Sequence, residues 1–202
     1  MRPGILGDVK SFADGLSVVF LKETSKFGYI NSKGEWAIYP QFSDAKEFCD
    51  GVAKVELNRK KGLIDTTGKW IIEPEADSIT RCAQSGIYLV EINNKYGFKN
   101  KTGEWTAPTI FEEASKCGDE SSTVFMAVRL DGKIGILDPT KHYDSEEAWI
   151  VKPCFTDEIK LWQNFNSEFI VAKLDNKYGF IDHDGEWVIE PKFKDIDPFS
   201  DG

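Results

Sequence analysis

Short apolar runs recur along the chain, and each is bounded by polar residues. Five of these runs are rich in Val, Ile, Leu, Phe and Tyr and cover residues 16–21, 52–57, 88–92, 125–130 and 169–174. Each is followed by a few polar residues and then by a second apolar run that contains a glycine. Runs of this length and composition, separated by turn-forming residues, predict β-strands joined by hairpins.

The glycine of the second run marks an internal repeat. Its five copies are Gly28, Gly62, Gly97, Gly135 and Gly179, and successive copies lie 34, 35, 38 and 44 residues apart. A tryptophan follows each glycine, at Trp36, Trp70, Trp105, Trp149 and Trp187, with a proline three or four residues later. We interpret these as structural positions of the repeat, and the longer spacings as insertions in surface loops.

Two kinds of turn separate the strands within one copy. Polar residues such as Asn58, Asn93 and Asp175 precede the glycine run and tolerate the left-handed backbone of a hairpin turn. A second glycine, such as Gly34 or Gly68, precedes the tryptophan and supplies a positive φ. We expect the tryptophan strand to end at its proline, because proline has no N–H to donate to a central ladder.

A weaker element, with two apolar residues three positions apart such as Ala45 and Phe48, precedes each first run. One unit is therefore a meander of three or four short strands. The predicted repeats cover approximately residues 9–44, 45–78, 79–113, 114–158 and 159–195, with 196–202 starting or duplicating a further repeat. We expect the whole chain, 1–202, to be a single domain.

The shared frame is G-[FYLI]-I-[DN]-x-x-G-x-W-x-I-x-P, which Gly62 to Pro74 follows throughout. This frame resembles the WG-repeat family of bacterial proteins over nearly the whole chain. Departures at Lys99, at Ala107 and in residues 138–148 mark the third and fourth units as degenerate copies. The resemblance implies β-structured repeats that mediate interactions, and it implies no reaction.

The tryptophan strands carry apolar residues at consecutive positions, as in Ile71 and Ile72 after Trp70. Neighbouring residues of a strand point to opposite faces, so we expect both faces of each sheet to be covered by adjacent repeats. Two all-β architectures meet this condition: a five-bladed, propeller-like array of short antiparallel meanders, and an open β-solenoid. Ring closure, which removes exposed edges, favours the first. The short repeat favours the second.

Charge and composition narrow the classes of partner. The chain has 25 Lys and Arg against 34 Asp and Glu, a formal net charge of −9. Nucleic-acid affinity comes mostly from basic residues, so we expect no nucleic-acid partner. No apolar stretch is long enough for a bilayer and no signal-peptide core is present, so we expect no membrane partner and a cytoplasmic location, or secretion if a leader was removed. The four cysteines form no C-x-x-C pair, and we expect them to be reduced core residues.

Motifs for catalysis or for a bound metal do not emerge. Residues 62–69 place five residues between two glycines where a phosphate-binding loop has four. The acidic turn at 182–186 lacks the further oxygen ligands of a calcium loop, and the chain has only two histidines. We therefore expect no catalytic residue, no metal and no cofactor.

Loops that break the repeat are the expected binding surface, because repeat scaffolds display specificity there. These loops cover residues 116–123, 139–147 and 161–168. The candidate binding residues lie in or beside them and are Trp149, Trp162, His142, Tyr143, Asp144 and Glu146.

Together these features favour a non-catalytic protein–protein interaction module, either an adaptor or an immunity-like partner of a basic protein. The alternative is a lectin-like carbohydrate-binding repeat protein, which requires exposed tryptophans. A glycoside-processing enzyme is the least favoured hypothesis, because paired carboxylates alone nominate no acid and base. The oligomeric state is left open.

Overall fold

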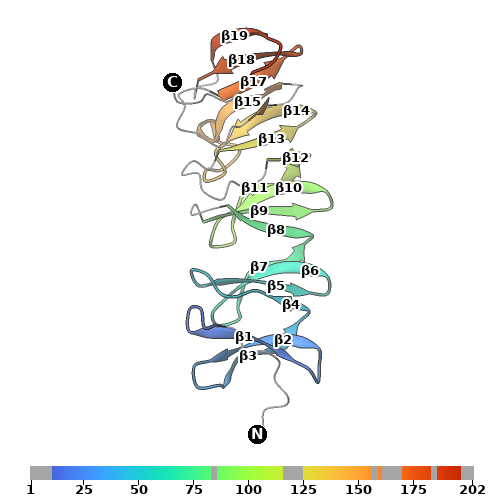
Figure 1. The fold of residues 1–202 in the computed structure, drawn as a ribbon, viewed down its shortest axis with the longest axis vertical. Helices are drawn as coiled ribbons and strands as arrows, with labels where there is room; N and C mark the ends of the chain where they lie inside the picture. Colours follow the sequence, from blue (N-terminus) through green and yellow to red (C-terminus); the bar gives the residue numbers. More distant parts are fainter. Residues whose placement is uncertain are drawn as a thin grey trace. The chain divides into compact units, whose positions relative to one another are not determined.

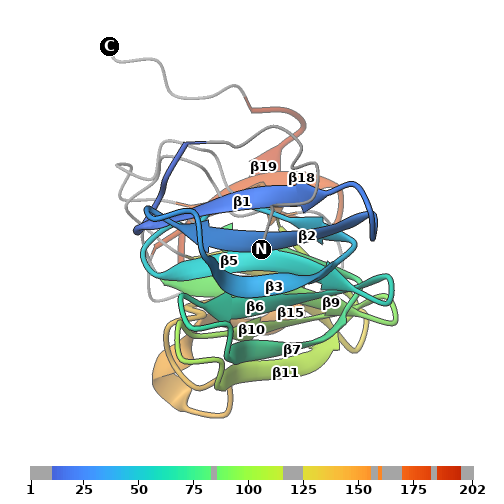
Figure 2. The same cartoon turned by 90° about the horizontal axis from the view of Figure 1, so that it is seen from below.

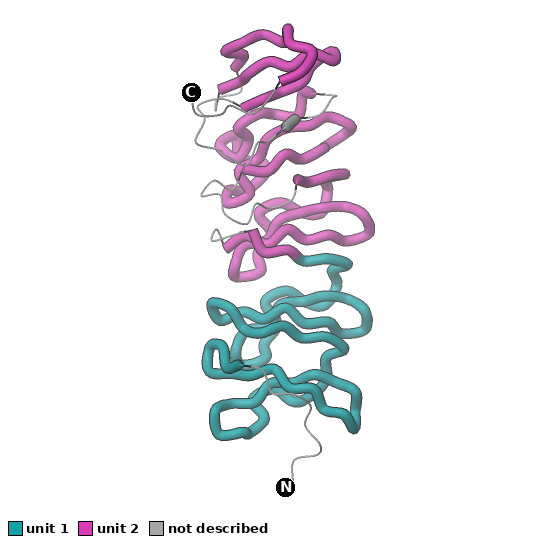
Figure 3. The backbone as a smooth tube through the Cα atoms, in the orientation of Figure 1, with its two compact units in different colours: residues 1–79 teal, residues 80–202 magenta. Residues whose placement is uncertain are grey.

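A computed structural model of the chain describes residues 11–82, 86–115, 125–155, 159–160, 170–182 and 186–196. These residues form five sheets of short antiparallel strands (Figure 1). The chain divides into two compact units, residues 1–79 and residues 80–202 (Figure 3).

Unit 1 contains the first two sheets. The first sheet has the order β1-β2-β3, with strands β1 (Leu16–Leu21), β2 (Lys26–Asn31) and β3 (Trp36–Phe42). Figure 2 shows these three strands side by side. The second sheet has the order β4-β5-β6-β7, with strands β4 (Asp44–Ala45), β5 (Val52–Leu57), β6 (Lys60–Asp65) and β7 (Trp70–Ala76).

The other three sheets follow the same plan. The third sheet consists of β8 (Ser78–Cys82), β9 (Ile87–Ile92), β10 (Lys95–Lys99) and β11 (Trp105–Phe111). The fourth consists of β12 (Glu113–Ala114), β13 (Met126–Leu130), β14 (Lys133–Leu137) and β15 (Trp149–Phe155), with the 3-10 helix η2 (Glu146–Ala148) before β15. The fifth consists of β16 (Ile159–Lys160), β17 (Ile170–Leu174), β18 (Lys177–Ile181) and β19 (Trp187–Phe193).

The predicted all-β repeat array of short antiparallel meanders is confirmed. In every sheet the strand that begins with tryptophan lies at one edge. Strands β4, β8 and β12 each begin one residue before the predicted start of a repeat. The single-domain extent, and the choice between a closed ring and an open solenoid, stay predictions.

Both kinds of turn adopt the backbone that the sequence predicts. The hairpin residues Asn58, Asn93 and Asp175 have φ angles of 54°, 52° and 51°. Gly34 and Gly68, which precede the tryptophans, have φ angles of 78° and 86°. Left-handed turn residues match the twist of the two strands that they join, so the turns fix the register of each hairpin.

An Asp or Asn at the end of the glycine strand caps the turn before the tryptophan. Oδ1 of Asp65 accepts hydrogen bonds from the backbone N–H of Thr67 at 2.9 Å and of Lys69 at 3.0 Å, and from the Thr67 hydroxyl at 2.6 Å. Asn31 and Asn100 accept the same two backbone bonds in their own repeats. The Asp-or-Asn position of the frame therefore serves as a turn cap.

The proline does not end the tryptophan strand, and that expectation is wrong. Strand β7 continues through Pro74 to Ala76, which still pairs with Lys61. The next pair is Leu63 with Ile72. Between these two pairs the chain advances four residues on β7 but only two on β6, so β7 carries extra residues. Pro74 lies in this bulge at the sheet edge, where the ladder requires no N–H from it. The same register shift recurs in all five sheets.

A second bulge explains the consecutive apolar residues. Trp70 pairs with Ile64 and Ile72 pairs with Leu63, so Ile71 is an extra residue on β7. The apolar run therefore does not require two covered faces. Val188 holds the position of Ile71 in β19 and is 49% exposed. The expectation that both faces of every sheet are covered is wrong for β19.

The strand glycines are required because the bulged tryptophan strand approaches them closely. A Cβ on Gly62 would lie 2.7 Å from the carbonyl oxygen of Ile72 and 2.7 Å from Cζ3 of Trp70. At the equivalent glycines of the other repeats, a Cβ would lie 2.7 Å or less from the carbonyl oxygen of the facing strand; these are Gly28, Gly97, Gly135 and Gly179. None of the five has a positive φ. Their role is to leave space for the facing strand.

Within each unit, an apolar layer joins one sheet to the next. In unit 1, Tyr29 and Phe42 of the first sheet pack in one cluster with Phe48 and Val55 of the second. The ring of Phe48 lies 4.8 Å from that of Tyr29. Two further clusters form the corresponding layers of unit 2.

One aromatic contact recurs in these layers, and we call it the Phe–Trp pair. It joins the phenylalanine that ends one tryptophan strand to the tryptophan that begins the next. Its examples are Phe42 with Trp70 at 6.0 Å, Phe111 with Trp149 at 6.3 Å and Phe155 with Trp187 at 5.7 Å between ring centroids. The rings meet edge to face, a geometry worth about 0.5–1.5 kcal/mol beyond the buried area.

The cysteines do not follow the expectation of four reduced core residues. Cys82 is buried but disulfide-bonded. Cys49 and Cys154 are exposed, and position 117 lies outside the described residues. Cys49 and Cys154 therefore contribute little to the core. Their spacing in the sequence reflects only the length of the repeat.

Gly62→Ala should destabilise the chain by roughly 2–3 kcal/mol, because the new methyl group meets backbone and an indole ring that cannot both move away. Gly34→Ala is the matched control: no atom lies within 4 Å of its Cβ, and only the positive φ opposes it, at a cost of about 1 kcal/mol. Urea unfolding followed by circular dichroism measures both. Equal losses would contradict the close-approach explanation.

Asp65→Asn should change how the free energy of unfolding depends on pH in acid. The Thr67 hydroxyl, followed by the backbone N–H groups of Lys69 and Thr67, lowers the pKa of the Asp65 carboxyl. A lowered folded-state pKa means that the carboxylate stabilises the fold above the unfolded-state pKa of about 4, and that this contribution disappears as pH falls through the folded-state pKa. Asparagine keeps the acceptor, as Asn31 does. The unfolding free energy of the variant should therefore fall less between about pH 7 and about pH 3; an unchanged pH profile would contradict this.

Candidate binding surface

Residues 138–148 form a long insertion between a glycine strand and its tryptophan strand. Leu137 pairs with Trp149, in the register that joins Ile64 to Trp70. Leu137 and Trp149 are twelve residues apart in the chain, whereas Ile64 and Trp70 are six residues apart. The insertion therefore lengthens the turn and leaves the sheet unchanged.

Backbone and indole hydrogen bonds anchor this loop. The N–H of Asp138 donates to the carbonyl of Ala148 at 2.8 Å and closes the base of the loop. The N–H of Tyr143 donates to the carbonyl of Thr106, on β11 of the preceding sheet, at 2.8 Å. Nε1 of Trp149 donates to the carbonyl of Tyr143 at 2.8 Å. The loop is thus attached both to its own strand and to the neighbouring sheet.

The tip of the loop presents charged side chains to solvent. His142 Nδ1 lies 2.5 Å from Asp144 Oδ1, and both side chains are more than half exposed. Glu146 is 93% exposed and its Oε1 lies 3.3 Å from Lys152 Nζ. Glu147 is also exposed. Exposed ion pairs contribute little to stability, so these groups can be recruited by a partner at small cost.

Trp149 and Tyr143 belong to the base of the loop and are partly buried. Both pack against the apolar cluster between the third and fourth sheets. Trp149 also forms the Phe–Trp pair with Phe111. Its ring therefore has the same structural role as Trp70 and Trp187, and in addition supports the loop.

Of the six candidate residues from the sequence, five lie in this one loop or at its base: Trp149, His142, Tyr143, Asp144 and Glu146. Trp162 lies outside the described residues, as do the candidate loops at 116–123 and 161–168. The surface formed by His142, Asp144, Glu146 and Glu147 is called the acidic loop tip below.

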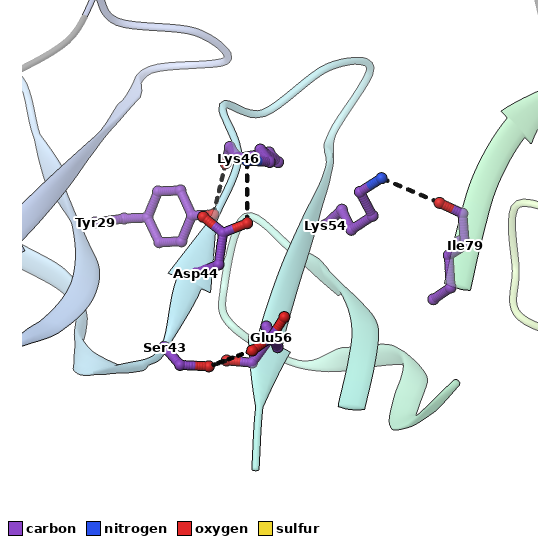
Figure 4. A network of polar contacts seen from close by, with 7 residues as sticks. All are labelled: Tyr29, Ser43, Asp44, Lys46, Lys54, Glu56 and Ile79. Atoms are coloured by element: carbon purple, nitrogen blue, oxygen red, sulfur yellow. Dashed lines mark hydrogen bonds and ion pairs between the residues drawn. The ribbon is translucent and has the colours of Figure 1, made fainter. Parts of the chain in front are cut away.

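A second polar cluster lies in unit 1 and was missed by sequence analysis (Figure 4). The Tyr29 hydroxyl donates to the carbonyl of Lys46 at 2.7 Å, and the Lys46 ammonium lies 3.0 Å from the Asp44 carboxylate. Burial, reinforced by the Asp44 charge, raises the pKa of the Tyr29 phenol. The cluster thus ties the residue that follows β4 of the second sheet to the first sheet.

Lys54 is the unusual member of this cluster. Its Nζ donates to the carbonyl of Ile79 at 3.0 Å, and burial, with the charges of Lys61 and Lys46, lowers its pKa. The register aligns Lys54 with Val18 in the first sheet. The sequence signal that could have identified Lys54 is a lysine at a position that is apolar in another repeat.

The described parts of the chain contain no group of three or more His, Cys, Asp or Glu side chains placed to hold a metal ion. Over the same residues, no helix is long and apolar enough to cross a membrane.

Trp149→Phe should loosen the loop while leaving the fold nearly intact. The variant keeps an aromatic ring on Phe111 but loses the indole bond to the Tyr143 carbonyl, at a cost of about 1 kcal/mol. Hydrogen–deuterium exchange of residues 139–147 should become faster. Trp187→Phe is the control, since it alters the same structural position where no insertion follows the glycine strand. Unchanged exchange in the Trp149 variant would contradict the anchoring role.

Solved structures of other proteins resemble this chain over most of its length. The solved structures that the chain resembles include apo AztD from Citrobacter koseri, at 14% identity and a TM-score of 0.39 over 96% of this chain, and virginiamycin B lyase from Staphylococcus aureus, at 19% identity and a TM-score of 0.35 over 89% of this chain. It spans 60% of the first protein and 67% of the second. No curated protein matches the chain.

The family model described as WG containing repeat matches residues 27–60, 62–96, 96–133 and 178–202, which is more than half of the chain. The chain belongs to the WG-repeat family.

Proposed function

We propose that the chain is a non-catalytic protein-binding module that engages a basic partner through the acidic loop tip. The observation that carries this proposal is the anchored loop at residues 138–148, in which exposed charged groups stand on a base fixed to two sheets. A loop that is ordered before binding loses less conformational entropy when the complex forms. Such a loop suits specific recognition better than a mobile one.

The negative charge of the acidic loop tip and of the whole chain supports the proposal of a basic partner. Asp144, Glu146 and Glu147 lie within four residues of one another, and the chain has a formal net charge of −9. Complementary charge speeds the encounter of two proteins and orients them, and this effect weakens as salt screens the field. Binding through the acidic loop tip should therefore be strongest at low ionic strength.

The packing of the tryptophans favours a protein partner over a carbohydrate. A sugar platform repeated along the chain would need an exposed indole face in each unit. Trp70, Trp149 and Trp187 instead place their rings against a phenylalanine and beside the strand glycine. These rings contribute to the apolar layers between sheets.

Neutralising the acidic loop tip should weaken partner capture. The test variant is Asp144→Asn with Glu146→Gln and Glu147→Gln, compared with Glu47→Gln, Glu73→Gln and Glu190→Gln, which removes the same charge from exposed positions elsewhere. Affinity purification from native cells, followed by mass spectrometry at low and high salt, identifies the partner. Its affinity for purified wild type and variants is then measured by calorimetry.

We expect the loop variant to bind at least about tenfold more weakly at low salt, and the control to bind nearly as well as wild type. Equal loss in both variants would show that only the overall charge matters. A partner whose affinity is indifferent to both variants and to salt would refute the proposed surface.

A further inference from the structure

Two departures from the repeat frame meet in the apolar layer between the third and fourth sheets. One is the small residue Ala107 on β11, and the other is the insertion within residues 138–148 of the next repeat. Ala107 pairs with Phe98 as Ile38 pairs with Tyr29, so it holds the position of Ile38 in its own sheet. The frame has isoleucine at this position, and Ala107 leaves most of that volume empty.

In unit 1, a large residue at this position faces a small turn. A Cβ on Gly68, in the turn before Trp70, would lie 3.3 Å from Cγ1 of Ile38 and 3.4 Å from its Cδ1. Protein interiors are packed too closely to absorb additional atoms at such distances. A turn that carried more atoms at this point would therefore displace the Ile38 side chain or be displaced by it.

In the fourth repeat, the insertion follows a turn that begins as in the second repeat. Oδ1 of Asp138 accepts the N–H of Thr140 at 3.0 Å, as Oδ1 of Asp65 accepts that of Thr67 at 2.9 Å. The additional residues of the fourth repeat therefore come after Thr140 and before β15.

At this place in unit 2 the sizes are reversed, so that a large loop covers a small residue. Tyr143 packs against the apolar cluster that contains Ala107, and its N–H donates to the carbonyl of Thr106 at 2.8 Å. Thr106 is buried, whereas Ala37 at the same position of β3 is exposed. The loop thus occupies the space over position 107 that an isoleucine side chain would need.

We infer that Ala107 is a positioning residue for the acidic loop tip. Its small side chain allows the loop of the next repeat to dock on the third sheet, and a larger residue at this position expels the loop. The two departures from the frame are then complementary halves of one site that spans two repeats. The role of this site in partner binding rests on the proposed function, but the docking of the loop does not.

Ala107→Ile tests the docking directly. The added methyl and methylene groups enter a layer that is already closely packed, so we expect hydrogen–deuterium exchange of residues 142–147 in the full chain to become about tenfold faster or more. Ala172→Ile is the matched control, because Ala172 is also fully buried but lies in the cluster between the fourth and fifth sheets. The loop of the control should exchange as in wild type. Unchanged exchange in the Ala107 variant, or equal acceleration in both variants, overturns the inference.

Tyr143→Ala supplies a compensating change. It removes the ring but keeps the backbone N–H that donates to Thr106. The double variant with Ala107→Ile and Tyr143→Ala should therefore exchange more slowly at residues 142–147 than Ala107→Ile alone. Two independent destabilising changes would instead add. A double variant that exchanges as fast as Ala107→Ile, or faster, contradicts the size complementarity.

If circular dichroism shows that Ala107→Ile does not fold, the same relation is tested in unit 1. Residues 139–148 replace Thr66 to Lys69 in two full-length variants, one that keeps Ile38 and one that carries Ile38→Ala. The transplanted loop should be protected from exchange only in the variant with Ile38→Ala. Equal exchange of the loop in the two variants overturns the inference.

Partner affinity separates this inference from the proposed function. Ala107→Ile changes a buried position and leaves every charged group in place. If the acidic loop tip binds the partner in its docked form, the variant should bind about tenfold more weakly, because the loop must be ordered during binding. Faster exchange of the loop with unchanged partner affinity would support the docking role of Ala107 and refute the proposed function.

Discussion

The structure depends on the close approach of a bulged tryptophan strand to the glycine strand beside it. The bulges around Ile71 and Pro74 bring the carbonyl of Ile72 so near Gly62 that no side chain fits between them. The same geometry places the Trp70 ring beside Gly62 and brings it into edge-to-face contact with Phe42 of the previous sheet. Glycine, tryptophan and proline therefore recur together at one local distortion, which requires the glycine and leaves room for the tryptophan and the proline. Sheet packing follows from it, since the tryptophan reaches the neighbouring repeat only when the glycine leaves it space.

Much of the fold could be predicted from sequence because its signals are local. Asn58 and Gly68 adopt the positive φ that their residue types indicate, and the apolar runs form the expected strands. The proline prediction failed because a bulge at a sheet edge removes the need for an N–H at Pro74, and single-residue rules do not include bulges. The reason for Gly62 was also hidden, since it lies in contact with a carbonyl ten residues away. Lys54 escaped notice because its environment depends on the register that pairs it with Leu63.

The candidate surface was predictable for a related reason. An insertion into a repeat is visible against its sister copies, and residues 138–148 therefore stand out in the sequence itself. The internal order of the insertion was not predictable, because Tyr143 bonds to Thr106 on another sheet and Trp149 bonds back to Tyr143. Those bonds separate a structural base, formed by Tyr143 and Trp149, from an exposed acidic tip. Sequence alone does not distinguish these two groups, because they are neighbours in the chain.

The unchanged register across residues 138–148 has a consequence for protein engineering. Leu137 and Trp149 pair as Ile64 and Trp70 do, although the connection between them is longer. The turn between the glycine strand and the tryptophan strand is thus a point where foreign peptide can be grafted without disturbing the scaffold. The sister turns at Ser32 to Glu35 and Thr66 to Lys69 offer equivalent acceptor sites, so one chain of this family could display several unrelated epitopes at fixed intervals.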